Sequence, residues 1–218
     1  MAETDPNMNP PSAVLAQQPT GRLRRRYGAW AVVTGASDGI GREMASRLAA
    51  AGLDLVLVAR REAALSSLAH ELEARHGVAT RVIAADLGDA AAVDSLAAAT
   101  GALDVGIWVA AAGFGTSGPF IDSSEREEAG DGGRQLPRRG RALPSLRRAL
   151  CPSPRGGIVL MSSLLAFQGV PRAAGYAATN AFVQSLAEGL HVELAPLGVD
   201  VVASAPGPIQ SDSPPAPG

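Results

Sequence analysis

Three glycines within seven residues, Gly35, Gly39 and Gly41, form the stretch of this sequence with the most specific chemistry. Glycine lets the backbone turn sharply and come close to a phosphate group. A helix beginning near Gly39 directs unpaired N–H groups and the positive end of its dipole at such an anion. The spacing therefore predicts a cradle for the pyrophosphate of a dinucleotide.

The residues around these glycines provide the context that such a cradle needs. Apolar strands are expected at 29–34 and 53–59, with an amphipathic helix at 39–51 between them. A glycine-rich loop alone is a weak signal. A loop that follows one strand and opens a helix leading to a second strand is typical of dinucleotide-binding folds.

The glycine spacing resembles that of the short-chain dehydrogenase/reductase family, and further motifs of that family follow at matching places over residues 30–207. Where that family usually has Asn-Asn-Ala-Gly after the fourth strand, this chain has three alanines and a glycine. The further matches are Asp86-Leu87, Ala110-Ala111-Ala112-Gly113, Ser162-Ser163, Tyr176 and Pro206-Gly207.

The resemblance implies an α/β, Rossmann-like doubly wound parallel sheet and an oxidoreductase that oxidises an alcohol or reduces a carbonyl. It assigns Asp86 to the adenine amino group and Leu87 to the wall of the same pocket. The residues that it assigns to the cofactor are Thr34, Gly35, Ser37, Asp38, Gly39, Ile40, Gly41, Arg60, Arg61, Asp86, Leu87, Ala110, Gly113, Tyr176, Pro206 and Gly207.

By the same resemblance, Ser163, Tyr176 and Asn180 occupy the catalytic positions. The Tyr176 hydroxyl would exchange a proton with the substrate oxygen, and Ser163 would hydrogen-bond that oxygen. Ser163 is expected at the end of a strand and Tyr176 on the following helix, so both can face the same crevice. Taken singly, Ser163 is also explained as a strand-end cap and Tyr176 as a core aromatic residue.

Asn180 departs from the family pattern, which has lysine four residues after the tyrosine. Residues four apart share one face of a helix, so a lysine there would bind the nicotinamide ribose and favour the phenolate. Asn180 can offer an amide hydrogen bond but no charge. All 19 basic residues are arginine, so no other lysine can replace it. Arg172 is expected on the surface, and impaired turnover is predicted.

A basic pair, Arg60 and Arg61, follows the second strand, where an acidic residue would bind the ribose hydroxyl of NAD. Arginine suits a 2′-phosphate because its planar fork makes paired contacts. The pair therefore predicts NADP(H), with two ordinary surface charges as the alternative.

The remaining pattern alternates strands and helices. We expect a sheet order of 3-2-1-4-5-6 with right-handed crossovers. The further elements are expected as helices at 62–76, 89–99 and 173–195, and strands at 79–85, 103–110, 157–162 and 198–204.

Residues 123–156 break this pattern with glycines, prolines and eight arginines. The resemblance calls for a long helix here that carries the active-site asparagine and much of a dimer interface. Glycine and proline rule out one continuous helix. Three interpretations remain open: a nucleic-acid-binding insert, which lacks aromatic residues for stacking, a flexible natural loop, and, as the favoured one, a pair of frameshifts.

The domain is expected at 28–209, between disordered tails at 1–27 and 210–218, without the usual substrate-covering helix and last strand. Arginines at 22–26 suggest either a solvated leader or contact with an anionic surface, and a signal peptide is disfavoured because the following apolar run is short.

The 218-residue chain is 46% hydrophobic with a net charge of −2, which fits one α/β domain. Its apolar runs are too short to cross a bilayer. The single cysteine, Cys151, makes a reducing cytoplasm the default. No metal, nucleic acid or membrane partner is predicted. The partner is a small alcohol or carbonyl compound, and a homo-oligomer of the family's type is compatible. The alternatives to an NADP(H)-dependent oxidoreductase are a catalytically silent NADP-binding protein and a frameshifted, non-functional product.

Overall fold

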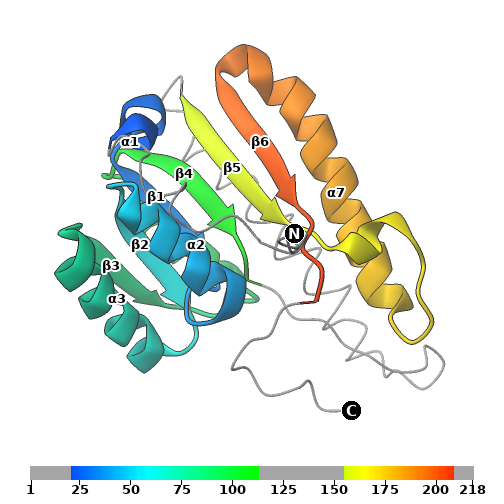
Figure 1. Ribbon diagram of the computed structural model, residues 1–218, viewed down its shortest axis with the longest axis horizontal. Coiled ribbons are helices and arrows are strands. Elements are labelled where there is room, and N and C mark those ends of the chain that lie inside the picture. The colour runs from blue at the N-terminus through cyan, green and yellow to red at the C-terminus, as the bar shows by residue number, and fades with distance from the viewer. Residues whose placement is uncertain (1–20, 113–154, 209–218) are drawn as a thin grey trace, which may run out of the picture.

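The structure is a computed structural model that describes residues 21–112 and 155–208. These residues form one six-stranded sheet of parallel strands in the order β3-β2-β1-β4-β5-β6 (Figure 1). The predicted doubly wound order is confirmed. The strands are β1 (Trp30–Thr34), β2 (Asp54–Ala59), β3 (Thr80–Ala84), β4 (Val105–Ala110), β5 (Gly156–Met161) and β6 (Val199–Ser204).

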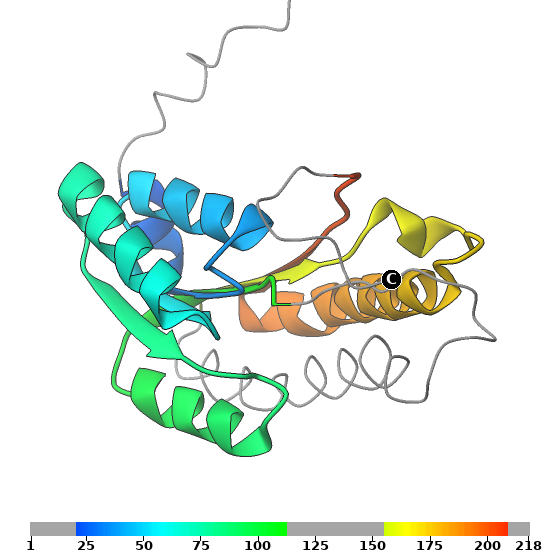
Figure 2. The same ribbon diagram turned by 90° about the horizontal axis from the view of Figure 1, so that it is seen from below.

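Helices cover both faces of the sheet, with α2 and α3 on one face and α4 and α7 on the other (Figure 2). Every strand and helix that was predicted within the described residues forms, with ends within two residues of those expected. The helices are α1 (Arg22–Tyr27), α2 (Gly39–Ala50), α3 (Glu62–His76), α4 (Ala90–Thr100) and α7 (Ala174–Leu194), and the 3-10 turns are η4 (Leu164–Phe167) and η5 (Ala195–Leu197).

The central strands are buried on both faces, which explains their unbroken apolar sequences. Alternate residues of each strand enter two different cores. Val33 of β1 and Leu57 of β2 pack toward α2 and α3, whereas Val32 of β1 and Val58 of β2 pack on the opposite face. All four are completely buried. This alternation follows from the two-residue repeat of a strand.

The N-terminal helix α1 corrects one prediction. Residues 22–27 were expected to belong to a disordered tail, but they form a helix whose Leu23 and Tyr27 pack against the first core. The expectation failed because six residues show no clear apolar period. Their partners are distant in sequence.

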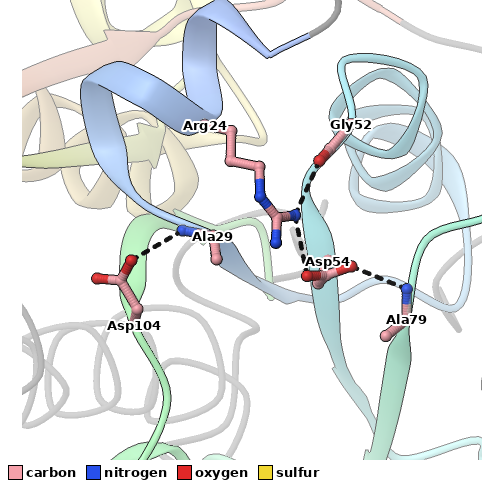
Figure 3. Close-up of polar contacts among 6 residues, drawn as sticks. All are labelled: Arg24, Ala29, Gly52, Asp54, Ala79 and Asp104. Atoms are coloured by element: carbon pink, nitrogen blue, oxygen red, sulfur yellow. Dashed lines mark hydrogen bonds and ion pairs between the residues drawn. The ribbon is translucent and has the colours of Figure 1, made fainter.

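Acidic side chains hold α1 and the neighbouring loops at the amino ends of the strands (Figure 3). Arg24 Nη1 lies 3.0 Å from Asp54 Oδ2, and the other oxygen of Asp54 accepts a 2.9 Å hydrogen bond from the Ala79 amide. Asp104 Oδ2 accepts a 3.1 Å hydrogen bond from the Ala29 amide. Arg24 therefore belongs neither to a solvated leader nor to an arm that contacts an anionic surface.

The end of α1 contacts β6, the strand at one edge of the sheet. The Tyr27 hydroxyl donates a 2.7 Å hydrogen bond to Asp200 in β6, and Arg26 makes a 3.0 Å ion pair with the same carboxylate. Glycines beneath this segment make room for it: a Cβ at Gly106 would lie 1.2 Å from the Tyr27 carbonyl oxygen, and one at Gly157 would lie 3.3 Å from the Tyr27 ring. We call residues 21–28 the amino-edge bracket.

Within the described ranges, no helix combines the length and apolar character needed to cross a bilayer. The predictions for 1–20, Gly113, most of 123–156 and 210–218 concern residues outside those ranges. Only Arg155 and Gly156 of the anomalous segment are described, and Gly156 begins β5.

Candidate active site

The glycine-rich loop joins the carboxyl end of β1 to α2, as predicted. Asp38 is the N-cap of α2, and its Oδ1 accepts a 2.7 Å hydrogen bond from the Gly39 amide. Gly39 therefore directs its N–H at Asp38 rather than at a ligand, which differs from the sequence expectation. The amides of Ile40 and Gly41 lie in the first helical turn, where no earlier helical carbonyl can accept from them.

Two of the three glycines are required by direct contact between backbones. Gly35 has φ of +70°, and a Cβ on it would lie 2.7 Å from the Ala111 carbonyl oxygen. A Cβ on Gly41 would lie 2.2 Å from the Gly35 carbonyl oxygen. The loop is thus packed backbone on backbone, in the form that close approach to a pyrophosphate requires. These residues fit a dinucleotide.

Thr34 fixes the loop after β4 beside this cradle. Its hydroxyl donates to the Val109 carbonyl at 3.2 Å and accepts from the amides of Ala111 and Ala112 at 3.1 and 3.2 Å. One donated and two accepted bonds use the full capacity of a hydroxyl. Thr34 therefore holds the loop after β4 in its position beside the glycine-rich loop. Ala110, at the end of β4, is part-buried against the second core.

The two arginines after β2 differ in their contacts. Arg61 Nη2 donates to the Ser37 carbonyl at 3.1 Å and lies 3.3 Å from Asp38 Oδ2, and its Nε lies 3.4 Å from Ser37 Oγ. Arg60 is exposed and makes no hydrogen bond or ion pair with the rest of the described chain. Of the two neighbouring arginines, Arg61 therefore contacts the glycine-rich loop and Arg60 is exposed to solvent.

The motif after β3 lies at the entrance to α4. Asp86 is exposed, and its Oδ1 accepts a 2.9 Å hydrogen bond from the Gly88 amide. Leu87 is part-buried against the second core. Asp86 thus shapes its own turn, and a carboxylate can accept further bonds.

Ser163 follows β5 and is the N-cap of η4. Its Oγ accepts a 3.2 Å hydrogen bond from the Leu165 amide, so the predicted cap is present. The cap uses acceptor capacity only, which leaves the hydroxyl hydrogen able to donate to a substrate oxygen. The Leu164 amide donates to the Pro206 carbonyl at 3.1 Å, and Leu164 also packs over Gly207. The Ser163 turn and the segment after β6 are therefore fixed together.

Tyr176 lies in the first turn of α7 and is part-buried, so it is not a core aromatic residue. One turn later, Asn180 is only 2% exposed, and its Nδ2 donates a 2.8 Å hydrogen bond to the Tyr176 carbonyl. The amide expected to face the ribose thus binds its own helix. Arg172 is exposed, with φ of 65°, in the turn before α7.

Ser162, to which the sequence motif assigned no role, is a positioning residue. Its hydroxyl donates to the Asn180 carbonyl at 3.1 Å, and its amide donates to the Ser204 carbonyl at 2.7 Å. Ser162 therefore connects the end of β5 to both α7 and β6. The only sequence signal was the doubled serine, which does not show where the first hydroxyl points.

The loops and turns that carry these residues follow the carboxyl ends of the strands (Figure 1). The glycine-rich loop follows β1, the arginines follow β2, and Ser163 follows β5, while η4 packs against α7, whose first turn carries Tyr176. This edge thus carries the glycine-rich loop and Ser163, and α7 begins with the turn that contains Tyr176. This arrangement can bind a dinucleotide and exchange a proton with a neighbouring substrate.

Comparison with known proteins agrees with this geometry. Residues 35–216 match the family model of enoyl-(acyl carrier protein) reductase. The very-long-chain 3-oxoacyl-CoA reductase of Meyerozyma guilliermondii is 37% identical over 191 residues, which is 81% of this chain. This chain spans only 55% of the length of that relative.

Two solved structures are similar over most of the described fold. A 7beta-hydroxysteroid dehydrogenase has a TM-score of 0.81 at 28% identity, covering 87% of this chain and 73% of its own. A short-chain dehydrogenase from Sphingobium yanoikuyae, solved in complex with NADPH, has a TM-score of 0.76 at 34% identity, covering 84% of this chain and 72% of its own.

Proposed function

Because the chain belongs to the short-chain dehydrogenase/reductase family, we propose that it is an NADP(H)-dependent oxidoreductase that interconverts an alcohol and a carbonyl compound. The observation that supports this proposal is that the glycine-rich loop follows β1, Ser163 follows β5, and Tyr176 lies in the first turn of the next helix. A nicotinamide dinucleotide bound there supplies hydride transfer. The protein must then orient the substrate oxygen and exchange a proton with it.

Ser163 and Tyr176 perform these two tasks in the proposal. Ser163 donates its hydroxyl hydrogen to the substrate oxygen while its oxygen remains the cap of η4. In the proposal, Tyr176 gives its phenolic proton to that oxygen during reduction, and its phenolate accepts the alcohol proton during oxidation. Hydrogen-bond donors held in place by a rigid strand end stabilise developing charge without reorganisation.

Arg60 supports the preference for NADP(H). It is exposed at the end of β2, and its guanidinium makes no hydrogen bond or ion pair with other described residues, so it is available to a 2′-phosphate. A solved relative binds NADPH. The cofactor-binding roles of Asp86, Leu87, Pro206 and Gly207 remain part of the proposal.

The substrate is proposed as a small-molecule alcohol or carbonyl compound. The names of the relatives indicate a 3-oxoacyl-CoA and a hydroxysteroid for those proteins, and both contain such groups. The single cysteine of the sequence supports a cytoplasmic location.

A catalytically silent NADP-binding protein is the second candidate, and Asn180 favours it. Asn180 supplies no positive charge beside Tyr176, and its amide already donates to the Tyr176 carbonyl. The cradle does not depend on this residue. Cofactor binding can therefore persist where turnover is lost.

Two measurements on the full chain separate the candidates. Fluorescence titration should show NADPH binding up to about fivefold tighter than NADH, the factor that one exposed ion pair supplies. NADPH oxidation is then followed with a panel of ketones and aldehydes. Slow turnover supports the oxidoreductase, binding without turnover supports the silent protein, and equal affinities contradict the NADP(H) preference.

A further inference from the structure

Arg60 and Arg61 are neighbours in sequence, but their surroundings assign them different tasks. The Arg61 guanidinium reaches back to the glycine-rich loop, where it meets the Ser37 carbonyl at 3.1 Å and Asp38 Oδ2 at 3.3 Å. Arg61 is also the N-cap residue of α3. Its side chain therefore connects the start of α3 with the turn that begins α2.

The negative charge of Asp38 makes this connection electrostatic as well as structural. Its carboxylate caps α2 by accepting from the Gly39 amide at 2.7 Å, so a negative charge lies at the helix end where an anion is expected. Arg61 lies against the second oxygen of that carboxylate. The side chain of Asp38 is 20% exposed and that of Arg61 is 56% exposed. The pair keeps the charge of Asp38 compensated beside the cradle.

We infer that Arg61 is a positioning residue that neutralises Asp38 and holds the glycine-rich loop, and that Arg60 alone selects the 2′-phosphate. The inference rests on the proposed function, since it divides cofactor recognition between two arginines. Arg61 contributes to the binding of any dinucleotide, with or without a 2′-phosphate. Arg60 contributes only where that phosphate is present.

The competing assignment makes Arg61 itself a ligand of the 2′-phosphate. That role requires its guanidinium to give up its contacts with the Ser37 carbonyl and with Asp38, the carboxylate that caps α2. Arg60 needs no such exchange, because it makes no ion pair with the described part of the chain. The contacts therefore favour the division of tasks.

The test is a set of cofactor titrations with NADPH and NADH. Arg61→Gln should raise the Kd for both cofactors by a similar factor, up to about fivefold for an exposed pair. Adding Asp38→Asn should bring both values back toward wild type, since asparagine can still cap α2 but carries no charge. Arg60→Gln is the matched control and should weaken NADPH only.

Weakening of NADPH alone by Arg61→Gln would overturn the inference, and so would failure of Asp38→Asn to compensate. A second measurement, hydrogen exchange of residues 35–41 in the cofactor-free protein, does not depend on the proposed function. Arg61→Gln should speed exchange there, whereas Arg60→Gln should not. Unchanged exchange in Arg61→Gln would overturn the positioning role of Arg61. If the wild type bound neither cofactor but the two variants differed in exchange as expected, only the proposed function would be contradicted.

Discussion

Arginines at the two edges of the parallel sheet differ in the contacts that they make. At the amino edge, Arg24 and Arg26 pair with Asp54 and Asp200, and Tyr27 shares the second carboxylate (Figure 3 shows the first of these pairs). At the carboxyl edge, Arg60 makes no such pair with the described residues. Arg24 and Arg26 are thus paired within the fold, whereas Arg60 is the cation that the proposed function assigns to the 2′-phosphate.

The comparison shows that charge content alone does not identify a binding site. The arginine cluster at 22–26 is the denser one in sequence, yet two of its side chains, Arg24 and Arg26, join α1 to the first residues of β2 and β6. Sheet topology gives the reason. The carboxyl ends of parallel strands open toward helix N-termini and loops, which is where ligands bind in such folds. The following predictions test this contrast between a structural edge and a chemical one.

The largest effect is expected for Tyr176→Phe, at the chemical edge. Removing the hydroxyl removes the proton donor, so kcat for ketone reduction should fall by about 10²–10⁴-fold. NADPH affinity, measured by fluorescence, should stay unchanged because the ring remains. A turnover rate unaffected by this substitution would mean that the site is misassigned.

Gly106→Ala should produce the largest effect at the structural edge. The new Cβ would lie 1.2 Å from the Tyr27 carbonyl oxygen, so the amino-edge bracket or β4 must move. We expect a loss of about 3 kcal/mol in the free energy of unfolding, measured in urea. Gly189→Ala is the control, because nothing lies within 4 Å of its added Cβ. Equal stability of the two variants would show that the bracket does not dock on β4.

Asn180→Lys should restore the missing charge beside Tyr176. We expect the rate of ketone reduction to rise at least about tenfold, which corresponds to ~1.4 kcal/mol in the barrier. Asn180→Gln is the neutral control and should give no gain. An unchanged rate for the lysine variant would show that Asn180 does not limit turnover.

The smallest effect concerns pH and the Tyr27 hydroxyl. Burial, followed by the hydrogen bond to Asp200, raises the pKa of Tyr27, although Arg26 opposes the shift. A raised folded pKa stabilises the protein below the unfolded value of about 10, and this contribution is lost as the pH rises through the folded value. Tyr27→Phe should cost about 1 kcal/mol at neutral pH.

Urea unfolding between neutral and strongly alkaline pH provides the check for Tyr27. The difference in stability between wild type and Tyr27→Phe should be constant up to about pH 10 and should shrink above it. A difference that grows with pH would contradict the assigned hydrogen bond.

Much of the fold could be predicted because its signals are local. Apolar runs such as that of β2, and glycines that must accept backbone contact, such as Gly35 and Gly41, mark their elements without reference to the rest of the chain. The α1 helix was missed because its contacts, with the first core and with Asp54 and Asp200, are made to residues far away in sequence. Six residues cannot form a stable helix by local propensity alone.

The sequence by itself determined the order of strands and helices, the family resemblance and the positions of Ser163, Tyr176 and Asn180, because these depend on residue type and short spacing. The tertiary structure decided which polar groups are already engaged. It directs the Asn180 amide to the Tyr176 carbonyl, Arg61 to Asp38, and Ser162 to α7. A side chain's partners depend on which distant segments the sheet brings together, and hydrogen bonds form only within about 3.5 Å.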